Sequence, residues 1–264
     1  MPSVSTRAGE LFYEESGAGD PLLLLHATLH DHRDFDSIAP ELAKRHRVIA
    51  VDWPGHGESA PVGESFDLSA PLLADLLEDV IDSLGLDRVS LIGNSVGGFA
   101  AARFAATHPD RVRSLVLVNS GGFTKMNLVS KSFCAAMGTP LINRAIMPLF
   151  IRAYMKTQSD NDKLVAERAL TKSRTSEGTQ TAADLWRSFA DPRHDLTALA
   201  AQITAPTLIV WGSKDTAIPL RDGRRAASLI PGARLETLPT GHVAFSSQPD
   251  QFLALVEPFL SQAK

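Results

Sequence analysis

The stretch that decides the fold is RVSLIGNSVGGFAAARFA, residues 88–105. A short apolar run enters GNSVGG, and an alanine-rich segment follows at once. This is G-x-S-x-G between a predicted strand and a predicted helix. A sharp turn that exposes the Ser95 hydroxyl crowds the chain two residues to either side, where Gly93 and Gly97 carry no Cβ to collide. The pattern predicts a nucleophilic serine at a helix start, where free N–H groups favour negative charge.

Other short apolar runs, each bounded by Gly, Pro or polar residues, predict further strands. With the run before Ser95, they cover residues 22–25, 48–51, 89–92, 115–118, 208–211 and 235–238. Most lack polar alternation, as expected for strands that are buried on both faces. Helix-like segments lie between them, for example residues 68–86, which close on Gly85. This alternation predicts right-handed crossovers and a largely parallel sheet, an α/β fold.

The alternation breaks between residues 118 and 207. Residues 121–200 contain eleven Lys or Arg and seven Asp or Glu, a local charge of +4, and they show helical patterns without a strand-like run. A loop of that length is unlikely in a compact domain. We therefore predict a core of residues 1–120 and 201–264 with a helical cap inserted at 121–200. An ordinary helical subdomain is the alternative to a lid over a pocket.

A serine hydroxyl needs a base, and the base needs an orienting acid. His242 lies in the loop of TLPTGHVAF, after a late strand-like run, and Asp215 follows the apolar strand of TLIVWGSKD. Asp191, Asp195 and Asp222 are rivals for the acid, but none directly follows a strand. The order Ser, Asp, His along the chain differs from that of the chymotrypsin and subtilisin folds. We predict Ser95, Asp215 and His242 as a catalytic triad.

Several segments together resemble the α/β-hydrolase superfamily nearly end to end. VDWPGHGES (51–59) is similar to the family's D-x-P-G-x-G-x-S turn, and PTLIVWGSKDTAIP and GHVAFSSQPDQF are similar to its acid and histidine loops. The resemblance implies the α/β-hydrolase fold, with a mainly parallel eight-stranded sheet, helices on both faces and an inserted helical cap. The backbone N–H groups of Val96 and Thr28 are the implied oxyanion donors. Ala27 stands where the family usually has glycine.

The loop that contains Thr28 also has a metal-like pattern. HATLHDHRDFD (26–36) includes H-x-H-x-D at His30, His32 and Asp34, similar to part of a metallo-β-lactamase signature, but Phe35 replaces the final histidine. No second cluster has ligand spacing. We therefore expect no metal, and we expect His30 and His32 to face solvent or to contact substrate at the pocket mouth. His26 is expected to form structural hydrogen bonds behind the loop.

Composition narrows the class of protein. The net charge of −4 argues against a nucleic-acid partner, and the single Cys134, expected to be buried, permits no intrachain disulfide. The N-terminus lacks a signal-peptide core, and no apolar run is long enough for a transmembrane helix. We expect a cytoplasmic protein without a membrane partner or cofactor that acts on a small molecule. Its oligomeric state is open, a homodimer included.

Ser95 in place of an aspartate disfavours haloalkane dehalogenase or epoxide hydrolase activity. The leading hypothesis is a serine hydrolase of a small ester, lactone or related acyl compound. A carbon–carbon hydrolase of the meta-cleavage-product type is the alternative, because GNSVGG is similar to that group's nucleophile turn. However, Val243, Ala244 and Phe245 replace the aromatic positions that follow its histidine. A ligand sensor with little or no turnover is the third reading.

Overall fold

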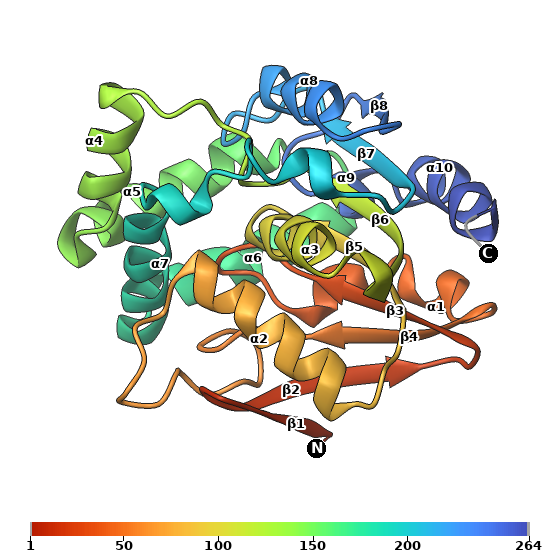
Figure 1. Ribbon diagram of the computed structural model, residues 1–264. Helices are drawn as coiled ribbons and strands as arrows, with labels where there is room; N and C mark the ends of the chain where they lie inside the picture. Colours follow the sequence, from red (N-terminus) through yellow and green to blue (C-terminus); the bar gives the residue numbers. More distant parts are fainter. Residues whose placement is uncertain (1, 263–264) are drawn as a thin grey trace.

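The computed structural model describes residues 2–262, and within them the chain forms one eight-stranded sheet of order β1-β2-β4-β3-β5-β6-β7-β8 (Figure 1). β2 pairs antiparallel with both β1 and β4, and the other neighbours are parallel. The strands are β1 (Ser3–Thr6), β2 (Gly9–Ser16), β3 (Asp20–Leu25), β4 (His46–Val51), β5 (Val89–Asn94), β6 (Val112–Val118), β7 (Thr207–Gly212) and β8 (Arg234–Leu238).

Helices cover both faces of this sheet (Figure 1). The α-helices are α1 (Ala39–Leu42), α2 (Ala70–Ser83), α3 (Val96–Thr107), α4 (Leu128–Met137), α5 (Pro140–Met155), α6 (Asp160–Arg174), α7 (Ser176–Ser188), α8 (Leu220–Leu229), α9 (Ala244–Ser247) and α10 (Pro249–Gln262). Short 3₁₀ turns are η1 (His32–Phe35), η2 (Pro109–Arg111), η3 (Pro192–His194) and η4 (Ala200–Gln202). Successive strand residues serve opposite cores: Leu23 and Leu25 pack with α2, α3 and α8, whereas Leu22 and Leu24 pack with α1, α9 and α10.

The predicted α/β fold is therefore confirmed, and every predicted strand run lies inside a strand. The two N-terminal strands were not predicted from residue patterns. Apolar and polar residues alternate only weakly along residues 9–16, because β2 lies near the sheet edge and is half solvated. Antiparallel strands at an edge need little apolar sequence, so they give a weak signal.

Four consecutive helices, α4 to α7, stand between β6 and β7. They occupy the segment that the sequence predicted to be helical, and the domain boundaries at 120/121 and 200/201 stay a prediction. Among residues 2–262, no single helix is long and apolar enough to cross a membrane. α4 and α5 meet that test only together, and they are bent by 104° relative to each other.

Candidate active site

Ser95 occupies the strained turn that the sequence predicted. It joins β5 to α3 with φ 56° and ψ −115°, a left-handed conformation that is costly for a residue with a side chain. A Cβ on Gly97 would lie 2.3 Å from the carbonyl oxygen of Leu25, and one on Gly93 would lie 2.5 Å from that of Gly97. The strain is held by main-chain hydrogen bonds, because Ser95 N–H donates to Val118 O at 3.1 Å and Gly121 N–H donates to Ser95 O at 2.9 Å.

Asp215 and His242 meet at the carboxyl ends of β7 and β8. His242 Nδ1 lies 2.7 Å from Asp215 Oδ2, and both side chains are buried. In the neutral imidazole this places the proton on Nδ1 and leaves Nε2 as an acceptor. His242 and Ser95 border the same cavity. The three rival acids serve elsewhere. Asp191 caps η3, Asp195 accepts a hydrogen bond from Thr197 N–H at 2.9 Å, and Asp222 accepts one from Thr124 Oγ1 at 2.8 Å.

Asn119 and Asn94 hold this pair in place, and the sequence reasoning missed both. Asn119 Nδ2 donates to Asp215 Oδ2 at 2.6 Å, while its Oδ1 accepts from Gly212 N–H at 2.9 Å. Asn94 Nδ2 donates to the main-chain oxygen of His242 at 3.1 Å. Their position in the sequence could have indicated this role. Each asparagine lies at the carboxyl end of a buried strand, which is the edge of a parallel sheet where ligands bind.

The inserted helices also position His242. Its N–H donates to the main-chain oxygen of Tyr154 at 2.9 Å, and the two rings contact edge to face with centroids 5.1 Å apart. A Cβ on Gly241 would lie 2.2 Å from the carbonyl oxygen of Met155, so only glycine permits this close approach to the end of α5. The histidine loop and α5 are therefore joined through both backbone and side chains.

The predicted oxyanion loop turns tightly between Ala27 and His30. His30 N–H donates to Ala27 O at 3.2 Å, and the left-handed φ of this turn falls on Leu29, at 68°. The alanine therefore takes no left-handed φ, so its Cβ is tolerated where the family usually has glycine. Thr28 and Val96 both border the cavity that Ser95 faces.

His26 lies behind this loop as a fully buried, neutral group. Trp53 N–H donates to His26 Nε2 at 3.0 Å, which requires the proton on Nδ1, and Nδ1 then donates to Ala27 O at 2.7 Å. Burial lowers the pKa of His26, which favours the same neutral form. The expected structural role of His26 is confirmed.

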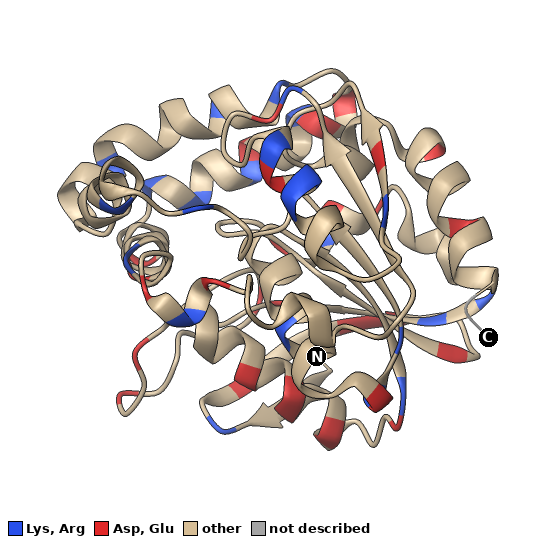
Figure 2. Cartoon of the chain, turned by 45° about the horizontal axis from the view of Figure 1, so that its top comes forward, with Lys and Arg blue, Asp and Glu red and all other residues tan. Residues whose placement is uncertain are grey.

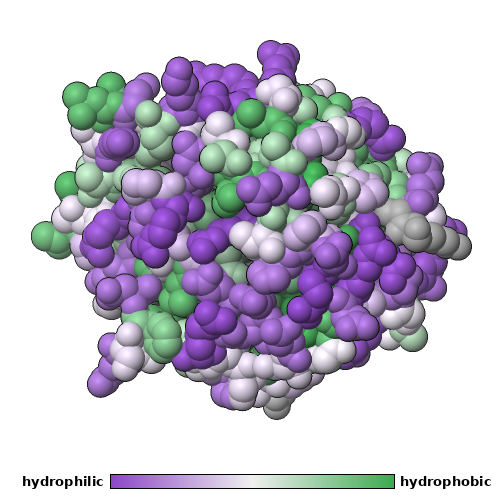
Figure 3. Space-filling view, in the orientation of Figure 1, coloured by the Kyte–Doolittle hydropathy of each residue, from purple (hydrophilic) through white to green (hydrophobic). Residues whose placement is uncertain are grey.

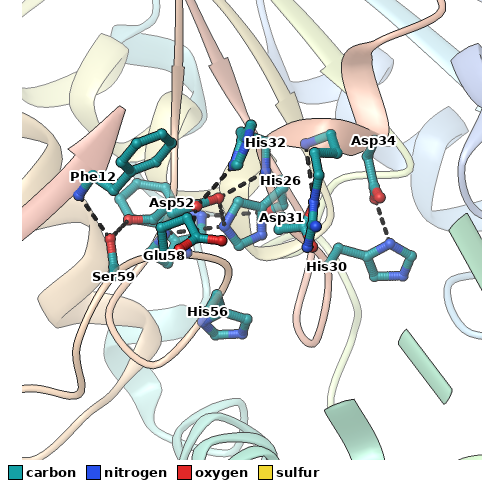
Figure 4. Close-up of polar contacts among 12 residues, drawn as sticks. Phe12, His26, His30, Asp31, His32, Asp34, Asp52, His56, Glu58 and Ser59 are labelled. Atoms are coloured by element: carbon teal, nitrogen blue, oxygen red, sulfur yellow. Dashed lines mark hydrogen bonds and ion pairs between the residues drawn. The ribbon is translucent and has the colours of Figure 1, made fainter. Parts of the chain in front are cut away.

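The expected exposure of His30 and His32 is wrong, because both side chains are buried. Figure 4 shows them turned toward different carboxylates. His30 Nδ1 bonds Asp34, whereas His32 Nδ1 lies 2.8 Å from Asp52 Oδ2. A buried imidazole needs partners for its nitrogens, and these carboxylates come from η1 and from the end of β4. Within residues 2–262, no group of three or more metal-ligating side chains lies close enough to hold an ion.

Beyond its hydrogen bond to Asp34, His30 reaches the inserted helices. Its Nε2 lies 3.1 Å from the hydroxyl of Tyr154, and Tyr154 borders the cavity. Arg168 on α6 completes the cluster, with Nη2 3.2 Å from Asp34 Oδ1. The H-x-H-x-D segment thus connects the predicted oxyanion loop to α5 and α6.

The cavity beside Ser95 has a volume of about 170 Å³. It is bordered by Ala27, Thr28, Ser95, Val96, Gly121, Thr124, Met126, Ser130, Phe133, Cys134, Met147, Phe150, Tyr154, Trp186, Phe189, His194, Ala217, Ile218 and His242. This set contains no Lys, Arg, Asp or Glu. Burial raises the pKa of Cys134 to about 11, so its thiol stays protonated at neutral pH. Burial lowers the pKa of His194 to about 4, so it too is uncharged.

In this mainly parallel sheet, the strained Ser95 follows β5, and Asp215 and His242 follow β7 and β8. Such an arrangement is typical of the α/β-hydrolase fold. The family described as alpha/beta hydrolase fold matches residues 20–249. The chain belongs to this α/β-hydrolase family and is a hydrolase of that fold.

Proteins similar to this chain are hydrolases that are named for different substrates. It is 33% identical to a 2-hydroxy-6-oxononadienedioate/2-hydroxy-6-oxononatrienedioate hydrolase of Klebsiella pneumoniae, over 86% of this chain and 81% of the relative. It is 30% identical to a pimeloyl-[acyl-carrier protein] methyl ester esterase of Neisseria meningitidis, over 90% and 92%. A thermophilic esterase from Thermogutta terrifontis has the same fold, with TM-score 0.83, 24% identity and coverage of 99% and 98%.

Proposed function

We propose that this chain is a serine hydrolase that cleaves a small, uncharged ester, lactone or related acyl compound through an acyl-enzyme on Ser95. The observation that carries the proposal is His242, which is hydrogen-bonded to Asp215 and borders the same apolar cavity as the strained Ser95. In this arrangement His242 can act as the base for Ser95, and the apolar cavity excludes water from the reacting groups.

In the proposed reaction, these groups act in turn. Ser95 Oγ attacks the carbonyl carbon while His242 Nε2 takes its proton, and Asp215 stabilises the imidazolium. The N–H groups of Val96 and Thr28 donate to the oxyanion, each worth about 2.7–4 kcal/mol in comparable enzymes. Collapse expels the leaving group, which receives the proton from His242. Water then attacks the acyl-enzyme with His242 again as base, releasing the acid and Ser95.

The inserted helices act as a cap in this proposal, because they provide much of the cavity wall. Met126, Phe133, Met147, Phe150 and Trp186 all come from this segment and border the cavity. The volume of about 170 Å³ is close to that of an engineered cavity of about 150 Å³ that binds benzene. A ring or a short acyl chain therefore fits beside Ser95, and a long chain requires movement of the cap.

A carbon–carbon hydrolase is the second candidate, supported by the 33% identical relative. The substrate for which that relative is named is a dicarboxylate. The cavity wall of this chain contains no Lys or Arg, and a carboxylate buried without a cation or several hydrogen bonds is strongly disfavoured. This difference in charge favours the uncharged acyl compound as substrate.

A substrate panel separates these readings. Short p-nitrophenyl esters, small lactones and a vinylogous diketo diacid are assayed in parallel, and we expect turnover of the first two classes. Turnover of the diacid alone would transfer the assignment to carbon–carbon cleavage, and absence of any turnover would favour a ligand sensor. The proposed chemistry needs no cofactor, so EDTA should leave the rate unchanged.

The nucleophile is tested by labelling. A fluorophosphonate should label the wild-type chain and Ser90→Ala but not Ser95→Ala. Ser90 is a matched control, because it is a buried serine on the same strand whose partner is Ser114, at 2.9 Å. Equal labelling of Ser95→Ala would refute the assignment.

A further inference from the structure

α4 and α5 expose an unusual amount of apolar surface. We call it the apolar face, and it comprises Leu128, Val129, Leu141, Ile142, Ile146 and Leu149. Leu128 and Leu141 are each 80% exposed, and Leu149 is 68% exposed. Hydrophobic atoms gather at the upper left edge of the molecule, over α4 (Figure 3). Single exposed leucines are ordinary, but six exposed apolar side chains on two successive helices point to an interaction surface.

The spacing on α5 shows that this exposure is one face of a helix. Ile142, Ile146 and Leu149 recur at i, i+4 and i+7 and are exposed. Met147 and Ile151, on the other side, are buried against the rest of the protein. A helix with two apolar faces, of which its own protein covers one, needs a partner for the other.

Within the segment that forms this face, the charges are of a single sign. Residues 125–156 contain Lys125, Lys131, Arg144, Arg152 and Lys156 but no Asp or Glu, although the whole chain has a net charge of −4. All five cations are exposed, and none forms an ion pair with another residue in the range 2–262. In Figure 2, α4, the helix at the far left, shows blue and no red.

This charge pattern indicates which kind of partner binds to the apolar face. A second copy of the chain in a symmetric dimer would bring the same cations together across the interface, which is unfavourable. An anionic lipid surface instead offers apolar chains to the leucines and phosphates to the cations. We propose that the apolar face docks on an anionic lipid surface, with α4 and α5 lying in the interfacial plane.

The same helices connect that surface to the cavity. Phe133 on α4 is 40% exposed and also borders the cavity, as does Phe150 on α5. A docked chain would therefore present its cavity wall to molecules dissolved in the lipid. No single helix within residues 2–262 is long enough to span a bilayer, so the contact is peripheral. The proposal revises the expectation of no membrane partner.

Vesicle flotation with the full chain tests the proposal without any measurement of turnover, so its outcome is independent of the proposed activity. Vesicles of neutral phosphatidylcholine are compared with vesicles containing 30% phosphatidylglycerol, at low and high salt. We expect at least about tenfold stronger binding to the anionic vesicles at low salt, and loss of most of that gain at high salt.

Two variants and a control locate the surface. Leu141→Glu with Leu149→Glu should weaken binding at least about tenfold, as should Lys131→Glu with Arg144→Glu. Leu164→Glu, at a leucine that is 56% exposed on α6 outside the apolar face, should bind like the wild type. Circular dichroism and thermal melting confirm that each variant is folded.

Three results would overturn the proposal. The first is equal binding to neutral and anionic vesicles, and the second is unchanged binding by both double variants. The third is a wild-type dimer in analytical ultracentrifugation that Leu141→Glu with Leu149→Glu converts to a monomer, because the apolar face would then be a self-interface.

Discussion

Tyr154→Phe is the sharpest probe of the contact between the proposed oxyanion loop and the inserted helices. The change removes one oxygen and creates almost no space, so its cost comes from hydrogen bonding. The hydroxyl lies 3.1 Å from Nε2 of His30, whose other nitrogen bonds the buried Asp34. Loss of the phenol leaves that Nε2 buried without a partner, which costs about 1–3 kcal/mol of unfolding free energy.

Urea unfolding monitored by circular dichroism measures this change, with an unchanged m value expected. Tyr13→Phe is the matched control, because the chain has two tyrosines and the Tyr13 hydroxyl has no partner among residues 2–262. In a His30→Phe background, Tyr154→Phe should cost less by about 1 kcal/mol, since the acceptor is already gone. Stability of Tyr154→Phe within about 0.5 kcal/mol of the wild type would refute the reasoning.

Three further predictions follow from single contacts. Asp215→Asn should lower kcat on the order of 10⁴-fold with little change in KM, as in serine proteases, because His242 loses the carboxylate that stabilises its imidazolium. A decrease in kcat of less than tenfold in steady-state assays would contradict this. Gly97→Ala should destabilise the chain by more than about 4 kcal/mol, because its Cβ would lie 2.3 Å from a main-chain oxygen, whereas Gly63→Ala, with its nearest atom at 3.8 Å, should unfold like the wild type in urea. Burial lowers the pKa of His56 from 6.5 to about 3. Between these pH values the imidazole is therefore protonated in the unfolded chain but neutral in the folded chain. The unfolding free energy should therefore fall by up to about 1.4 kcal/mol per pH unit between pH 6.5 and 3, and His56→Gln should reduce that slope in urea titrations at several pH values.

Local sequence was enough for the parallel core and for the turn that bears Ser95. Strands that are buried on both faces require continuous apolar runs, and the strained turn requires glycine at Gly93 and Gly97. These are short-range steric and solvation constraints, so they are visible without a structure. β1 and β2 were not predicted, because strands at a half-solvated sheet edge require no continuous apolar run.

Local sequence was not enough to predict the contacts of the site, because the residues that meet there are distant in the chain. Asn119 is 96 residues from Asp215, and Tyr154 is 124 residues from His30. The spacing of His30 and His32 resembled a metal motif, but folding brought Asp34 to one and Asp52 to the other. Which buried donor meets which acceptor depends on how the layers pack, and that packing is a property of the whole chain.

The sequence by itself determined the positions of six strands along the chain, the strained serine and the candidates for acid and base, because each depends on neighbours within a few residues. The tertiary structure alone decided that the Ala27 position needs no glycine, since the turn places its left-handed residue at Leu29. It alone decided which side of α5 is covered, because 3.6-residue spacing shows two apolar faces and only packing chooses between them.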